Sequence, residues 1–115
     1  MQIERINYNS PQFTAIRADR NGKALISLRI RNRNNQLSDW AELVKIIENQ
    51  KNNPNEILIT KNGGDNRLKI TITHAITGLK KKVYEGLPQF DSPIEFIKCG
   101  IQQEEKMNKL LTNNA

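Results

Sequence analysis

The sequence has few of the residues that usually mark catalysis, metal binding or covalent cross-links. It contains one cysteine, one histidine and one tryptophan in 115 residues, and aromatic side chains make up 5% of the chain. Because Cys99 has no second cysteine to pair with, an internal disulfide is excluded, and a reducing compartment is favoured. Because His74 is the only histidine, a histidine-rich metal cluster is excluded as well. We therefore expect no cofactor and no metal site.

Long apolar runs are also absent. The stretch MQIERINYNSPQF has neither the basic start nor the continuous apolar segment of a secretion signal, and no later segment has the length of a membrane span. We expect a cytoplasmic protein, or one that acts in a host cytosol if it is a translocated bacterial protein, without membrane insertion. The length fits one domain over residues 1–115, with flexible ends at 1–11 and 112–115.

Positive charge is what the sequence has in excess. The chain carries 18 Lys and Arg against 12 Asp and Glu, which gives a net charge of +6. Such a balance permits nucleic acids, anionic membranes or acidic proteins as partners, and it does not choose among them.

The hydropathy pattern predicts an α+β domain with the order ββαβββα. Residues 12–18 and 24–31 alternate apolar and polar positions and flank Asn21-Gly22, a pair that is typical of tight hairpin turns. Three further strands are expected at residues 56–61, 67–76 and 79–86. We therefore expect a single antiparallel sheet of about five strands.

Two helices are predicted to pack on one face of this sheet. The first covers SDWAELVKIIENQ, with Ser38 or Asp39 as its cap and Glu42 closing a capping box with Asp39. The second runs from about Pro93 to about Leu111. Ser92 suits its cap position and Pro93 its first helical position.

The strands at 67–76 and 79–86 are expected to pair around a two-residue turn, Thr77-Gly78. Their alternation then separates an apolar face, interrupted by His74 and Lys81, from a basic outer face. The outer face carries Arg67, Lys69, Lys80, Lys82 and Tyr84. Lysines two apart on a strand project together and a tyrosine can stack on a base, so this face is the candidate surface for nucleic-acid binding. The alternative is an ordinary solvated sheet face, which the scarcity of aromatic residues favours.

Catalysis is not the leading interpretation. Cys99 and His74 are the remaining pair for a hydrolase or transferase, but Cys99 is expected inside a helix rather than at its N-terminus, where the thiol pKa would be lowered. The glycine pair in NGGDN lacks the spacing of a phosphate-binding loop, and the carboxylates show no paired spacing. The chain is therefore expected not to be an enzyme.

From about Asp39 to Leu111 the predicted order of helix, three antiparallel strands and helix resembles the double-stranded RNA-binding domain. The resemblance is one of topology. It implies RNA binding through a basic cluster at the start of the second helix, whereas the corresponding stretch here is SPIEFIKC, which is apolar and acidic.

The interpretation we favour is a small, non-catalytic regulator that binds another protein, such as an inhibitor or adaptor of a bacterial enzyme or effector. In the predicted first hairpin, Ile16 and Leu25 lie beside Arg29 and Arg31, and such a mixed apolar and basic surface is typical of interfaces. The alternative partner is a nucleic acid at the basic outer face.

The last helix offers a second candidate interface, including one for a homodimer. Met107 and Leu110 continue an apolar stripe that is broader than one packing face requires, and Gly100 would let another element approach closely. The pattern favours the alternative, a core helix. Trp40 is a residue type that is common at binding hot spots, but its place at the start of an amphipathic helix predicts a core position.

Overall fold

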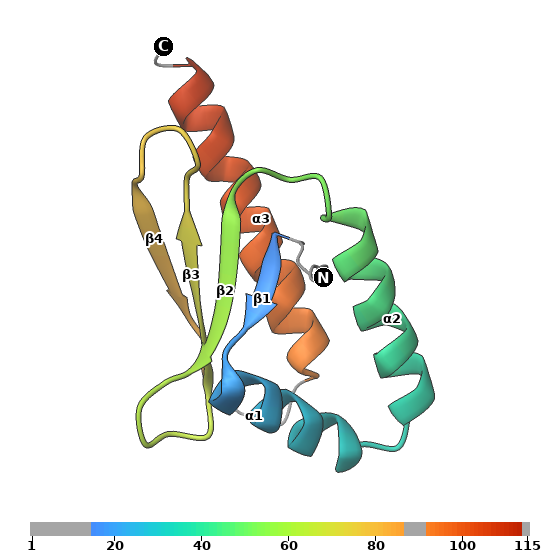
Figure 1. The fold of residues 1–115 in the computed structure, drawn as a ribbon. Helices are drawn as coiled ribbons and strands as arrows, with labels where there is room; N and C mark the ends of the chain where they lie inside the picture. The colour runs from blue at the N-terminus through green and yellow to red at the C-terminus, as the bar shows by residue number, and fades with distance from the viewer. Residues whose placement is uncertain (1–14, 87–91, 114–115) are drawn as a thin grey trace, which may run out of the picture.

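The structure is a computed structural model that describes residues 15–86 and 92–113 (Figure 1). Its elements are, in order, β1 (Ile16–Ala18), α1 (Arg20–Arg31), α2 (Gln36–Asn49), β2 (Glu56–Lys61), β3 (Leu68–Thr73), β4 (Lys80–Tyr84) and α3 (Pro93–Asn113). The sheet order is β1-β2-β3-β4, with β1 parallel to β2 and the other pairs antiparallel. The α+β class is confirmed. The order ββαβββα is wrong, because the described residues form four strands in a partly parallel sheet and three helices.

The segment 24–31, predicted as the second strand, belongs to helix α1. Asp19 precedes the helix, and its Oδ1 accepts a hydrogen bond of 2.7 Å from the backbone N of Gly22. The buried apolar residues of α1 are Leu25, Ile26 and Ile30, a helical spacing rather than an alternating one. Because α1 and α2 now connect β1 to β2, the chain re-enters the sheet in the same direction and the two strands are parallel.

The helices form layers on one face of the sheet. α1 packs on β2, α3 packs on β3 and β2, and α2 packs on α1 and α3 (Figure 1). The centre of the core is almost fully buried and consists of Ile30, Ile57, Ile59, Leu68, Ile70, Ile72, Ile94 and Ile97. Gly100 lies over Ile70, since a Cβ atom on this glycine would be 2.5 Å from the Ile70 Cδ1. Gly100 therefore allows α3 to pack closely on strand β3 of its own chain, rather than on a second chain.

Helix α2 starts at Gln36, earlier than predicted, and Asp39 does not cap it. Asp39 lies in the first turn and accepts a hydrogen bond of 2.9 Å from Arg33 Nε. Glu42 forms an ion pair with Lys98 of α3 instead of closing a capping box. The predicted helix is present, but its predicted cap is wrong.

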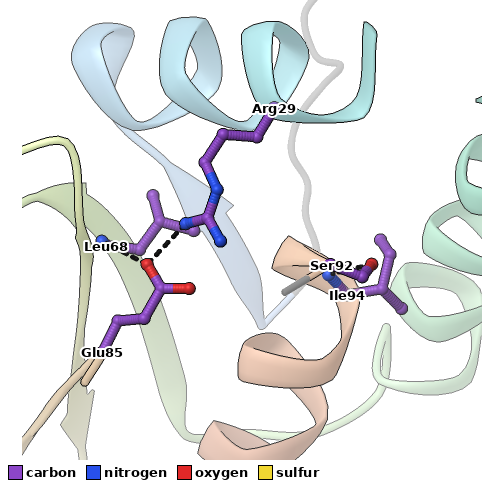
Figure 2. A network of polar contacts seen from close by, with 5 residues as sticks. All are labelled: Arg29, Leu68, Glu85, Ser92 and Ile94. Atoms are coloured by element: carbon purple, nitrogen blue, oxygen red, sulfur yellow. Dashed lines mark hydrogen bonds and ion pairs between the residues drawn. The ribbon is translucent and has the colours of Figure 1, made fainter. Parts of the chain in front are cut away.

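The Ser92 cap and the Pro93 start of helix α3 are as predicted. The backbone N of Ile94 donates a hydrogen bond of 3.1 Å to Ser92 Oγ (Figure 2), and Pro93 is the first helical residue. The helix continues to Asn113, two residues beyond the predicted end at Leu111.

The β3–β4 hairpin differs from the prediction by two residues of register. Ile70 pairs with Val83 and Ile72 with Lys81, because the connecting loop is longer than a two-residue turn. In that loop the backbone N of His74 donates to the Leu79 carbonyl oxygen at 2.8 Å. A shift of two residues leaves each side chain on its predicted face, since the side-chain period of a strand is two.

The segment 1–11 and residues 114–115 lie outside the described residues, whereas 112–113 belong to α3. None of the helices in the described ranges has the combination of length and apolar character needed to cross a membrane.

Candidate functional site

A groove of about 1000 Å³ lies between helix α2 and the body formed by β1, α1 and β2. Its apolar wall consists of Ile16, Ala18, Ile26, Leu43, Ile47 and Ile59, and its polar and amphipathic members are Arg17, Lys23, Ser27 and Trp40. A concave surface with a mainly apolar lining and a few polar groups is the usual form of a binding site. The groove is therefore the candidate functional site.

The groove exists because α2 packs on other helices and not on the sheet. Figure 1 shows α2 beyond the β1 edge, at the opposite end of the fold from β4. Two ion pairs hold it there, Arg33–Asp39 at the α1 side and Lys98–Glu42 at the α3 side. The hydrogen bond to the Glu42 carboxylate raises the pKa of Lys98 above its ordinary value.

The apolar residues of helix α2 form two adjacent stripes, one buried and one exposed. Leu43 is buried in the core, with Ile46 and Ile47 packed against it. The other apolar stripe faces solvent: Leu37 is 88% exposed, Trp40 39% and Val44 64%. These three positions follow the spacing i, i+3 and i+7, so they share one face of the helix. We call Leu37, Trp40 and Val44 the α2 stripe.

Trp40 joins the α2 stripe to the groove. Its side chain lines the groove and is also part of the exposed stripe, so the expected core position is wrong. Large, partly exposed aromatic side chains beside a pocket are the residues that most often anchor protein partners. The groove rim next to it is basic. Arg17 pairs with Glu56 at 2.9 Å, whereas Lys23 is exposed and forms no ion pair within the described part of the chain.

The residues that the sequence analysis predicted as a protein interface are not brought together. Ile16 and Leu25 are core residues, and the exposed hairpin face on which they were expected does not exist, because the second strand is a helix. Met107 is buried as well. Arg31, at the end of α1, and Leu110, on α3, are exposed.

Arg29, the remaining predicted interface residue, is part of a buried ion pair (Figure 2). Its Nη1 lies 2.5 Å from Glu85 Oε1, and the two side chains are only 10% and 7% exposed. The same carboxylate oxygen accepts a hydrogen bond of 2.9 Å from the backbone N of Leu68. This network connects α1 to the first residue of β3 and to the residue that follows β4. We therefore assign Arg29 a structural role.

The basic outer face predicted for the β3–β4 hairpin is largely present. Lys69 lies opposite Tyr84, and Lys80 and Lys82 follow on β4. Arg67 does not belong to the paired strands, because β3 starts at Leu68. It forms an ion pair with Asp65.

The start of α3, where the resemblance to RNA-binding domains places a phosphate contact, is not open to a ligand. Ser92, Pro93 and Ile94 are all buried. Phosphate binding at this position is therefore not supported.

The residues considered for catalysis, His74 and Cys99, belong to different elements, the β3–β4 loop and helix α3. The backbone N of Thr77 donates to His74 Nδ1 at 3.2 Å within the β3–β4 loop. Cys99 is exposed on α3, next to the Gly100 that faces the sheet. In residues 15–86 and 92–113, no group of three or more His, Cys, Asp or Glu side chains could hold a metal ion.

Comparisons of the chain with protein-family models, curated proteins and solved structures found no match. Its function is therefore inferred from its own described residues.

Proposed function

We propose that this chain is a non-catalytic protein-binding module that regulates its partner by direct contact, as an inhibitor or adaptor does. The observation that carries the proposal is the α2 stripe, Leu37, Trp40 and Val44, exposed beside an apolar groove of about 1000 Å³. An apolar helix face that is left in water has a free-energy cost which a partner surface would remove. Trp40 is the anchor, and the basic rim at Lys23 favours a partner with acidic groups around its apolar contact.

The test uses site-specific photo-cross-linking in cells that express the protein. A photoreactive amino acid replaces Val44 in one variant and Leu79 in the control. Both positions carry exposed aliphatic side chains, 64% and 52% exposed, but Leu79 lies in the β3–β4 loop on another surface. We expect a discrete cross-linked protein from position 44 and not from position 79.

The same product identifies the partner. A product of twice the mass of the chain is the one expected if the partner is a second copy, the homodimer alternative. With the captured protein purified, we expect Val44→Asp and Trp40→Ala to weaken binding by about tenfold or more each, as hot-spot residues do, and Leu79→Asp to leave it unchanged. Equal cross-linking from both positions, or binding that tolerates both α2 variants, would contradict the proposal.

A further inference from the structure

The sheet face opposite the helices carries three lysines without an acidic partner. These are Lys69 on β3 and Lys80 and Lys82 on β4, and none of them forms an ion pair with another described residue. Glu56 is the one carboxylate that the described strands place on this face, and Arg17 neutralises it at 2.9 Å. The charge of the face is therefore the uncompensated positive charge of the three lysines.

The strand register places these lysines in a row that begins beside an aromatic ring. Lys69 is directly opposite Tyr84, which is 56% exposed, and Lys82 and Lys80 continue along β4 in steps of two residues. Each step corresponds to roughly 7 Å along the strand. Thr71 and Thr73 lie opposite the two β4 lysines and add hydroxyl groups to the same surface. We call Lys69, Lys80, Lys82 and Tyr84 the outer cluster.

Protection of the sheet edge explains only part of the outer cluster. Lysines on an edge strand discourage pairing with other chains, and that role suits Lys80 and Lys82 on β4. Lys69, however, is on β3, which is paired on both sides by β2 and β4. Edge protection also gives no reason for an exposed tyrosine, Tyr84, beside these lysines.

We propose that the outer cluster binds a single strand of nucleic acid, with the lysines on its phosphates and Tyr84 stacked on one base. Phosphate contacts by lysine and stacking on an aromatic ring are the two elements of single-strand binding. An exposed ring stacks on the face of an unpaired base, which a duplex keeps inside its helix, so a single strand fits better than a duplex. The outer cluster lies on the sheet face opposite the helices. Binding there therefore involves none of the residues that line the groove.

The test is fluorescence anisotropy of labelled single-stranded RNA, single-stranded DNA and their duplexes, titrated with the full chain at several salt concentrations. Three lysine contacts to a single strand predict a slope of about −2 in log affinity against log salt. We expect the double variant Lys80→Glu, Lys82→Glu to weaken binding by about tenfold or more. The matched control is Lys106→Glu, Lys109→Glu, which gives the same net charge on the exposed side of α3 and should change affinity by about twofold at most.

Tyr84→Ala separates stacking from charge. It should weaken binding by about five- to 150-fold while the salt slope stays the same. Equal losses in the two double variants, duplexes bound as tightly as single strands, equal binding to vesicles of anionic lipid, or no binding at low salt would each overturn the proposal. Trp40→Ala should leave these affinities unchanged, so the two proposed surfaces can fail independently.

Discussion

A Cβ atom on Gly22 would lie 2.5 Å from the backbone carbonyl oxygen of Ile59. Helix α1 and strand β2 thus approach each other at backbone distance, and this contact sets one wall of the groove. Gly22→Ala should force the two elements apart, because a backbone atom cannot move as a side chain can. We expect a net destabilisation of about 1–3 kcal/mol in urea unfolding, despite the better helix propensity of alanine.

Gly100→Ala is the matched control for this prediction. Its Cβ atom would also meet a neighbour at 2.5 Å, but the neighbour is the Cδ1 end of Ile70, which can change rotamer. The loss should therefore be smaller than at Gly22. If Gly22→Ala were as stable as the unaltered chain, α1 would not pack on β2 as described.

The buried ion pair between Arg29 and Glu85 gives a second prediction. Arg29→Met would leave the Glu85 carboxylate buried without its cation, which is expected to cost about 3–5 kcal/mol of unfolding free energy. Arg17→Met is the control, because the Arg17–Glu56 pair is largely exposed and should contribute about 1 kcal/mol or less. Similar losses in the two variants by denaturant titration would show that the pair is not buried.

A third prediction concerns Asn55, which joins β2, the β3–β4 loop and α3. Its Nδ2 donates to Glu104 Oε2 at 2.7 Å and to Asn108 Oδ1 at 2.8 Å, and its Oδ1 accepts from the backbone N of Ala75 at 2.8 Å. Asn55→Ala should destabilise the fold by about 1–3 kcal/mol, because buried polar groups lose their partners.

Asn55→Asp should be worse than Asn55→Ala, since it places a second carboxylate against the buried Glu104. Denaturant titration at neutral pH gives the free energy of unfolding of both variants. An aspartate variant that is more stable than the alanine variant would contradict the described network.

The sequence predicted the C-terminal half of the fold well and the N-terminal third poorly. The strand at 56–61, the faces of the β3–β4 hairpin and the Ser92 cap depend on local patterns, and those patterns were unambiguous. In α1, by contrast, Ile26, Leu28 and Ile30 fit an alternating strand as well as a helix. Leu28 proved to be 42% exposed, so the helical spacing of Leu25, Ile26 and Ile30 was the correct interpretation.

One signal could have prevented this error. Asp19 stands three residues before Gly22, which is the spacing of a helix cap. Its carboxylate accepts a hydrogen bond from the backbone N of Gly22, as an N-cap residue does. The groove depends on α1 being a helix, so a sequence interpretation that makes residues 24–31 a strand cannot predict it. The outer cluster was predictable, because a two-residue change of register leaves the faces of a strand unchanged.

The measurement that tests the central claim most directly uses Trp40 itself. As the only tryptophan of the chain, it reports on the groove without a label. With the protein captured through position 44, we predict that binding shifts the Trp40 emission to shorter wavelength and reduces its quenching by acrylamide, and that Val44→Asp abolishes both changes. A partner that binds with the Trp40 emission and quenching unchanged would show that the groove is not the binding surface.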